Sequence, residues 1–147
     1  MLPFKAFPDG YLTSVLTTGE ILTHIEFPIL PVGTGTCFEE FSRRPADFAI
    51  VAVAAVLSLG PGGLIVEARI AIGGLGPAPV RLEPAENMLL GKNWTPERVD
   101  AAEQIARALH AEGDDDNTPD YRRHLAGVLT RRALNTAYAR SLEAQHV

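Results

Sequence analysis

The chain has 147 residues, 46% of them hydrophobic and 21% charged, with a formal net charge of −5 at pH 7. This length suits one domain with its own core. The acidic balance argues against a general nucleic-acid binder, which carries a basic surface. A single cysteine, Cys37, excludes an internal disulfide framework and cannot build a thiolate metal site alone.

The sequence also argues against secretion and membrane insertion. Residues 1–10 read MLPFKAFPDG and lack the continuous apolar stretch of a signal peptide. The longest apolar run, residues 48–57, is too short for a bilayer, which takes about 20 such residues. We therefore expect a soluble, cytoplasmic protein.

Strand signals dominate the chain up to about residue 80. Residues 11–16 and 21–27 are strand candidates separated by a Thr-Thr-Gly-Glu turn, and in the second candidate alternate residues share one face. The face in question would carry Ile21, Thr23, Ile25 and Phe27. Prolines and glycines, among them Pro28 and Gly35, then predict a loop, and residues 38–41 resume as a strand.

The apolar run 48–59 suits a buried strand or a helix by periodicity alone. The turn signal Gly-Pro-Gly-Gly at 60–63 follows it, and residues 64–72 then alternate in part. Two β-rich segments around a glycine turn favour a hairpin. A helix over residues 47–59 remains the alternative.

Helix signals dominate the second half. A short helix is expected over residues 82–90, closing at Gly91. Thr-Pro-Glu at 95–97 and Thr-Pro-Asp at 118–120 each combine an N-cap, a proline at the first helical position and an acid in the first turn. The sequence thus predicts an α+β fold in one domain, residues 1–147. A small antiparallel sheet (hairpins or a meander, about 10–80) precedes a three-helix bundle (about 82–143).

Familiar catalytic and metal-binding patterns are missing from the sequence. No Gly-x-Ser-x-Gly motif occurs, and Cys37 has the context of a core residue rather than a reactive thiol. The four histidines, His24, His110, His124 and His146, are scattered without ligand spacing. We predict no catalytic residue and no metal site.

Two further segments resemble ligand loops only superficially. The acidic run 114–116 lacks the alternating ligands of a calcium loop, which favours a solvated loop between helices. The glycines at 73, 74 and 76 are followed by Pro77 and Pro79 instead of a helix, so they do not form a phosphate loop. They are expected to end a strand where backbones approach closely.

Arginines are the more informative polar residues. Those of the last helix suit either a solvated face or an interface that recognises carboxylates: Arg122, Arg123, Arg131, Arg132 and Arg140. Arg43 and Arg44 differ, because a loop that also carries Asp47 can place a guanidinium beside a ligand.

Four segments, in order, resemble one known family. They are GYLT with GEILTHIEFP (10–13, 19–28), FEEFSRRPADFA (38–49), AIGGLGPAPVR (71–81) and YRRHLA (121–126). The chain resembles the C-terminal domain of the FAD-binding (medium) subunit of molybdenum hydroxylases, the xanthine dehydrogenase and carbon monoxide dehydrogenase flavoprotein family.

The resemblance implies a role in electron transfer. In that family the flavoprotein subunit receives electrons from a molybdenum-containing large subunit through an iron–sulfur small subunit. It passes them from FAD to an outside acceptor. The resemblance puts Arg43, Arg44 and Asp47 beside the flavin, where fixed charge tunes its electronics.

The family's main FAD-binding domain, with its glycine-rich phosphate loops, normally precedes this region. It is expected to be absent here, so FAD would be shared with a partner domain and bound weakly or not at all by the chain alone. The leading hypothesis is a domain that covers FAD held by a partner and helps intersubunit electron transfer in an oxidoreductase complex, without catalysis of its own. The alternative is a non-catalytic interaction or assembly module, for instance a homodimer, that kept the fold. A self-contained enzyme is the least supported reading.

Overall fold

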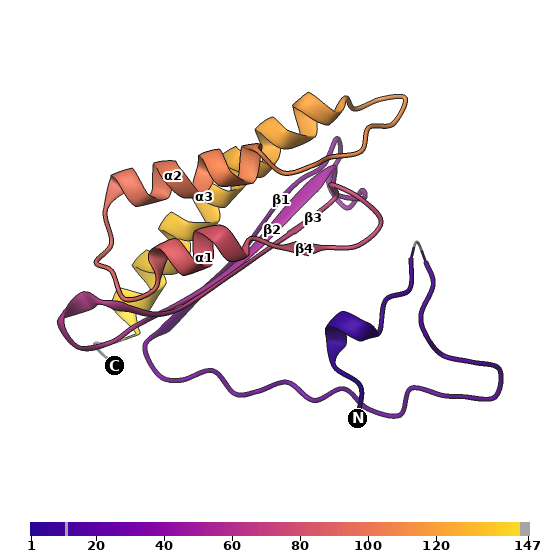
Figure 1. Cartoon of the computed structure of the whole chain (residues 1–147), viewed down its shortest axis with the longest axis horizontal. Helices are drawn as coiled ribbons and strands as arrows, with labels where there is room; N and C mark the ends of the chain where they lie inside the picture. The colour runs from indigo at the N-terminus through magenta and orange to yellow at the C-terminus, as the bar shows by residue number, and fades with distance from the viewer. Residues whose placement is uncertain (11, 145–147) are drawn as a thin grey trace. The chain divides into compact units, whose positions relative to one another are not determined.

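The computed structural model describes residues 1–10 and 12–144. The chain forms two compact units, Met1–Leu30 and Pro31–Val147 (Figure 1). The first unit holds one turn of 3₁₀ helix, η1 (Phe4–Ala6), and an isolated bridge between Pro8 and Ser14. The named strands and α-helices of the described residues all lie in the second unit.

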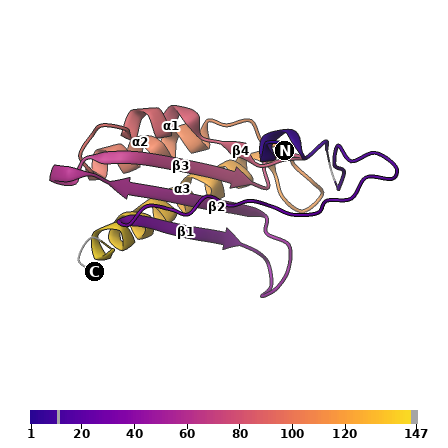
Figure 2. The ribbon, with the colours of Figure 1, turned by 90° about the horizontal axis from the view of Figure 1, so that it is seen from below.

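A four-stranded antiparallel sheet opens the second unit, with the strand order β1-β2-β3-β4. Its strands are β1 (Thr34–Phe41), β2 (Val51–Leu59), β3 (Ile65–Gly73) and β4 (Val80–Arg81). Each strand pairs with the next one along the chain, so the sheet is the predicted meander (Figure 2). The β2–β3 turn contains η2 (Pro61–Gly63), in which Gly62 and Gly63 adopt positive φ values that suit glycine.

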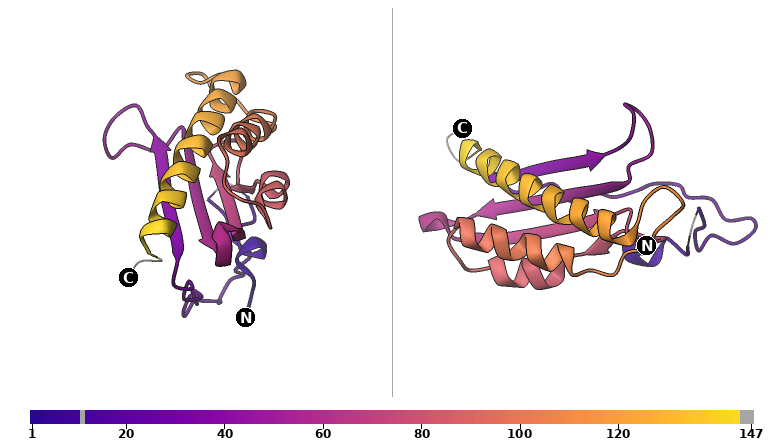
Figure 3. Two further views of the ribbon diagram at one scale, coloured as in Figure 1. Left: turned by 90° about the vertical axis from the view of Figure 1, so that its left-hand side faces the viewer. Right: turned by 90° about the horizontal axis from the view of Figure 1, so that it is seen from above.

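Three helices follow: α1 (Glu83–Leu89), α2 (Pro96–Arg107) and α3 (Pro119–Glu143). The two predicted N-caps are confirmed. The Thr95 hydroxyl accepts a hydrogen bond from the Arg98 N–H at 3.4 Å, and the Thr118 hydroxyl accepts one from the Tyr121 N–H at 3.2 Å. The helices form one layer on one face of the sheet, with α3 packed on β1 and β2 and α1 on β3 (Figures 2 and 3). The α+β fold is confirmed.

The core lies between the helical layer and the sheet. Alternate side chains of β2 are buried against the helices, namely Val51, Val53, Ala55 and Leu57. Alanines on α3 let this helix approach the sheet closely. At Gly35 of β1 the approach leaves no room for a side chain, since a Cβ there would lie 1.9 Å from the Ala137 carbonyl oxygen. Helix α3 is therefore held directly against the edge strand β1.

A buried carboxylate ties α1 to the other edge of the sheet. Glu86, 6% exposed, accepts hydrogen bonds through Oε1 from the Ile70 N–H and from Arg81 Nε, both at 2.8 Å. Its Oε2 accepts a third from Arg81 Nη2 at 2.7 Å. The bidentate pair with Arg81 satisfies the buried charge. The bond from the Ile70 N–H takes the place of a hydrogen bond between strands just beyond the end of β4.

The predicted strands ahead of residue 30 were wrong. Residues 21–27 form no strand, and within 11–16 only Ser14 makes a bridge; Tyr11 lies outside the described residues. A strand needs a neighbouring strand to bond with, and β-propensity alone does not supply one.

Two strand boundaries also differ from the prediction. β1 begins at Thr34 instead of residue 38, so Gly35 lies inside a strand, and β2 begins at Val51 instead of residue 48. The hairpin itself is confirmed, and the helical alternative for 47–59 was wrong. Across residues 1–10 and 12–144, no helix combines the length and the apolar character that a bilayer crossing requires.

Candidate functional site

The connection between β1 and β2 carries all three predicted site residues, and we call residues 42–50 the arginine loop. A hydrogen bond from the Ile50 N–H to the Phe41 carbonyl, at 2.8 Å, joins its two ends. Inside the loop, the Asp47 N–H donates to the Arg44 carbonyl at 3.2 Å. The loop is therefore a closed turn whose backbone is held by its own hydrogen bonds.

The side chains of the arginine loop point to different partners. Arg43 donates through Nη1 to Oδ2 of Asp116 at 2.8 Å, across 73 residues of sequence. Arg44 is exposed beside it, and the Asp47 carboxylate accepts from the Phe48 N–H at 2.8 Å. The structure thus brings the three predicted residues onto one loop, but Arg43 pairs with Asp116 rather than with Asp47.

Arg122, on the first turn of α3, anchors the end of the arginine loop. Its Nη1 donates to the carbonyl of Gly74 and lies 3.5 Å from that of Ile50, the last residue of the loop. Its Nη2 binds the Asp114 carboxylate, and the side chain is only 16% exposed. One guanidinium therefore links α3 to three different connections at this end of the sheet.

The loop between α2 and α3 completes this arrangement. Asp114 Oδ1 accepts from the Asp116 N–H at 3.0 Å, and from the N–H and the side-chain amide of Asn117 at 2.7 and 3.0 Å. Burial acts to raise the pKa of the Asp114 carboxyl, but these bonds and the one from Arg122 outweigh it and lower the pKa. Asp114 thereby orders the turn that presents Asp116 to Arg43.

The position just after β3, Gly74, requires glycine for its backbone conformation and for space. Its φ is +88°, and a Cβ there would lie 2.3 Å from the Ile50 carbonyl oxygen. The close backbone approach expected at these glycines is confirmed at Gly74 alone, where it brings the β3–β4 connection against the end of the arginine loop; a Cβ at Gly73 would meet no atom within 4 Å.

The arginines of α3 mostly serve contacts within the chain. Arg131 donates to the Asp100 carboxylate at 2.7 Å and binds Glu103, joining α3 to α2. Arg140 donates to the Thr36 carbonyl on β1 at 2.7 Å. Both arginines therefore hold contacts within the fold while remaining exposed. In the part of the chain that the structure describes, no three His, Cys, Asp or Glu side chains lie together as a possible metal site, and His146 lies outside that part.

Phe48 is a candidate that the sequence reasoning missed. Its side chain is 95% exposed on the arginine loop, next to Asp47. The sequence placed it inside a buried strand, and only the later start of β2 exposes it. An exposed aromatic ring on the same loop as two arginines offers a flat apolar face, and the arginines offer hydrogen-bond donors.

The part of the chain from β1 into α3, which includes the arginine loop, matches a known family. A model of the family described as "CO dehydrogenase flavoprotein C-terminal domain" matches residues 36–137, from β1 into α3. The chain belongs to this family.

Relatives of this flavoprotein family extend the match over most of the chain. The carbon monoxide dehydrogenase medium chain of Hydrogenophaga pseudoflava is 33% identical, over 95% of this chain and 48% of the relative. The nicotine 6-hydroxylase medium subunit of Paenarthrobacter nicotinovorans is 37% identical, over 92% and 47%. The chain thus spans about half the length of the curated relatives it matches.

Solved flavoprotein structures agree with the fold. Carbon monoxide dehydrogenase from Hydrogenophaga pseudoflava superposes with a TM-score of 0.86 at 35% identity, covering 92% of this chain and 47% of that one. Quinoline 2-oxidoreductase from Pseudomonas putida 86 gives 0.84 at 30% identity, covering 93% and 47%.

The family is that of the FAD-binding medium chains of molybdenum hydroxylases, in which this domain contributes part of the FAD site. The arginine loop carries side chains whose chemistry suits part of an FAD site. Arg44 and Phe48 are exposed and offer hydrogen-bond donors and an aromatic face, the chemistry that an isoalloxazine edge and ring accept.

Proposed function

We propose that this chain acts as the C-terminal domain of the FAD-bearing medium subunit in a molybdenum-hydroxylase-type oxidoreductase. Its arginine loop would cover FAD held by a partner FAD-binding domain and help electron transfer between subunits. The observation that carries the proposal is the anchored arginine loop. Arg43 is paired with Asp116 and the Ile50 carbonyl lies beside Arg122. Arg44 and Phe48 are exposed to solvent.

The proposal gives each loop residue a task. Flavin, when bound, accepts and donates electrons singly or in pairs. Arg44 would donate hydrogen bonds to the ring edge and stabilise added negative charge there, and Phe48 would exclude water from one ring face. Arg43, already paired with Asp116, would act mainly by setting the position of the loop, and Asp47 by binding the backbone of its own turn.

The proposed partners follow from the family. They are an FAD-binding domain, a molybdenum-containing large subunit and an iron–sulfur small subunit, as expected for medium chains such as those of carbon monoxide dehydrogenase. A cytoplasmic location is part of the proposal, because the single cysteine, Cys37, is free, as is usual in reducing compartments. The assignment of residues 1–147 to a single domain remains a prediction.

A reconstitution with flavin as the reporter tests this function. The purified chain is mixed with the FAD-loaded part of the Hydrogenophaga pseudoflava medium chain that precedes its C-terminal domain. Flavin fluorescence and midpoint potential are then measured. We expect the chain to quench the fluorescence. We also expect Arg44→Gln to lower the midpoint potential of the complex, because a fixed positive charge stabilises the electron-rich reduced ring.

Arg132→Gln is the matched control, since Arg132 is exposed on α3 and lies outside the arginine loop. A complex whose fluorescence and potential match those of the free flavoprotein part would contradict the proposal. That outcome would favour the non-catalytic interaction module instead.

A further inference from the structure

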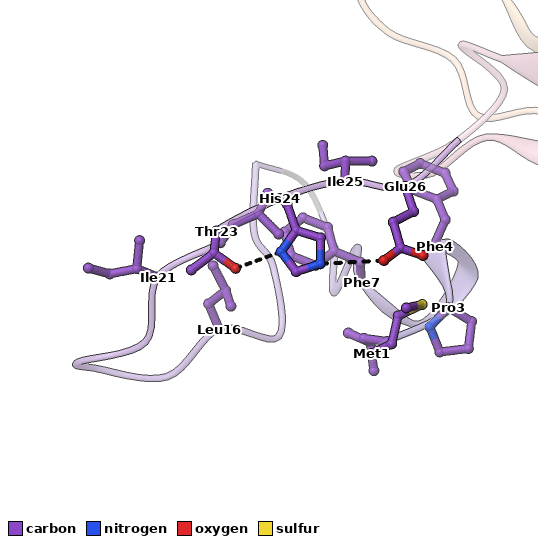
Figure 4. A pocket seen from close by; sticks show the side chains of 12 residues that line it. Met1, Pro3, Phe4, Phe7, Leu16, Ile21, Thr23, His24, Ile25 and Glu26 are labelled. Carbon is purple, nitrogen blue, oxygen red and sulfur yellow. Dashed lines mark hydrogen bonds and ion pairs between the residues drawn. The ribbon is translucent and has the colours of Figure 1, made fainter. Parts of the chain in front are cut away.

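The arginine loop takes its shape from its backbone and not from the walls of a cavity. Its residues from Arg43 to Phe48 are all exposed. A hollow of about 550 Å³ lies in the first unit, lined mainly by apolar side chains, and there His24 Nε2 lies 3.5 Å from Glu26 Oε1 (Figure 4). None of its lining residues belongs to the arginine loop. The directions of Arg44 and Phe48 therefore depend on the turn between them.

The tip of the arginine loop is a tight turn. The Asp47 N–H donates to the Arg44 carbonyl at 3.2 Å. Between them, Pro45 takes the second position and Ala46 the third, with a φ of +63° at Ala46. Proline at the second position and a positive φ at the third are the features of a type II turn. The Ser42 hydroxyl donates to the same Arg44 carbonyl at 2.8 Å, so two donors fix the start of the turn.

Alanine is an uncommon choice for the third position of such a turn. A positive φ brings Cβ close to the backbone, so this position is usually taken by glycine or asparagine. Within the described residues of the second unit, every other residue with a positive φ is a glycine. Ala46 is exposed, so packing in the core does not offset the cost of its conformation. Backbone conformations of this kind occur preferentially where the exact direction of the chain serves a ligand site.

The two ends of the arginine loop are fixed to α3. Phe41, the last residue of β1, contacts the ring of Tyr121 edge-on, with the ring centroids 6.5 Å apart and the ring planes at 85°. At the other end, Arg122 Nη1 lies 3.5 Å from the Ile50 carbonyl oxygen. With its ends held in this way, the direction of the tip is set by the turn that contains Ala46.

We infer that Ala46 is a positioning residue for the flavin contacts of the arginine loop. Arg44 stands two residues before it and Phe48 two residues after it, so the φ of Ala46 sets the directions of these side chains relative to each other. The left-handed turn would hold the guanidinium and the aromatic ring in the arrangement that the flavin meets on docking. The inference rests on the proposed function, in which Arg44 and Phe48 contact the flavin.

Two substitutions of similar size separate the conformations open to residue 46. A β-branched side chain hardly tolerates a positive φ, so Ala46→Val should drive the turn out of its left-handed form. Asparagine tolerates that form, so Ala46→Asn should keep it. Ala139→Val makes the same exchange as the first variant at an exposed position of α3. Both positions are exposed, so none of the three variants removes packing from the core.

The nuclear Overhauser effect in the chain alone measures the turn itself. In a type II turn the Hα of the second residue lies close to the N–H of the third, whereas in a type I turn the two protons lie farther apart. We expect a strong effect between Pro45 Hα and the N–H of residue 46 in the unsubstituted chain, in Ala46→Asn and in Ala139→Val. Ala46→Val should weaken it. Equal effects in all four proteins would overturn the inference.

The midpoint potential of the flavin then shows whether Ala46 acts through Arg44. The full chain is combined with the same FAD-loaded part of the Hydrogenophaga pseudoflava medium chain. We expect Ala46→Val to lower the potential in the direction of Arg44→Gln, by about half of that shift or more, and Ala46→Asn and Ala139→Val to leave it unchanged. In a chain that already carries Arg44→Gln, Ala46→Val should cause no further shift, because a positioning residue acts through the side chain that it positions.

The remaining outcomes separate this inference from the proposed function. If the complex forms and Ala46→Val keeps the potential of the unsubstituted chain, the inference is overturned and the function stands. Equal shifts from Ala46→Val with and without Arg44→Gln would show that residue 46 acts independently of Arg44, and would overturn the inference as well. An unsubstituted chain that leaves the flavin fluorescence unchanged would contradict the proposed function and, with it, this inference.

Discussion

The Arg43 guanidinium donates to the Asp116 carboxylate at 2.8 Å and so joins the arginine loop to the α2–α3 loop. Both side chains are more than half exposed, at 59% and 60%. An ion pair in such a place contributes little to the free energy of unfolding, because water and salt screen it. Its effect is on the geometry of the loop that carries Arg44 and Phe48.

Asp116→Asn should therefore loosen the arginine loop without unfolding the protein. We expect faster amide hydrogen exchange in residues 42–50 and a stability loss below about 1 kcal/mol, since the pair is solvent-exposed. Asp115→Asn is the matched control, as it removes the same charge one position away. Equal exchange rates in the two variants would show that the pair does not hold the loop.

Arg122→Met should cost far more. The variant keeps the apolar stem but leaves the carbonyls of Ile50 and Gly74 and the Asp114 carboxylate without their shared donor. We expect a loss of about 2–4 kcal/mol in the free energy of unfolding, measured by urea denaturation.

Arg123→Met is its neighbour and control. Arg123 pairs with the exposed Asp120 one turn away, so we expect a loss below about 1 kcal/mol. Similar losses for the two variants would mean that the contacts of Arg122 carry no special weight.

Gly35→Ala should separate α3 from the edge strand. The added Cβ would lie 1.9 Å from the Ala137 carbonyl oxygen and 2.4 Å from the Ser141 nitrogen, and both are backbone atoms that cannot rotate away. We expect a loss of about 2–3 kcal/mol, visible as a lower melting temperature. Gly73→Ala meets no atom within 4 Å and should change stability by less than about 0.5 kcal/mol. The reverse order of the two effects would contradict this packing.

Glu103 should make stability depend on pH. Burial acts to raise the pKa of its carboxyl, but hydrogen bonds from Arg131 and Arg107 outweigh burial and hold the pKa below the ordinary value of 4.5. A pKa lowered by folding stabilises the protein above pH 4.5, and this contribution is lost as the pH falls through the folded-state pKa.

Glu103→Gln should consequently reduce stability near neutral pH and flatten the loss of stability below pH 4.5. Urea denaturation at several pH values measures both effects, with Glu143→Gln, at the exposed end of α3, as the comparison. A variant that parallels the unsubstituted protein over the whole pH range would show that the two arginines do not act through this carboxyl.

Local patterns were enough to predict the helices of the second unit and its β2–β3 hairpin. The threonine caps at Thr95 and Thr118 and the glycine turn between β2 and β3 act within a few residues of themselves, so the sequence shows them directly. The family resemblance likewise placed Arg43, Arg44 and Asp47 on one loop.

Contacts between distant segments could not be predicted in this way. The sequence carries no local sign that Asp116 pairs with Arg43, that Arg122 reaches Ile50 and Gly74, or that Phe48 lies outside β2. These contacts exist because the meander and α3 bring three connections to one end of the sheet. For residues 21–27 the strand pattern is present in the sequence, but the chain as described offers no neighbouring strand to bond with. Sequence by itself determined which segments can become helices and strands, and tertiary structure decided which of them found partners, because hydrogen bonds and buried surface need a second segment in place.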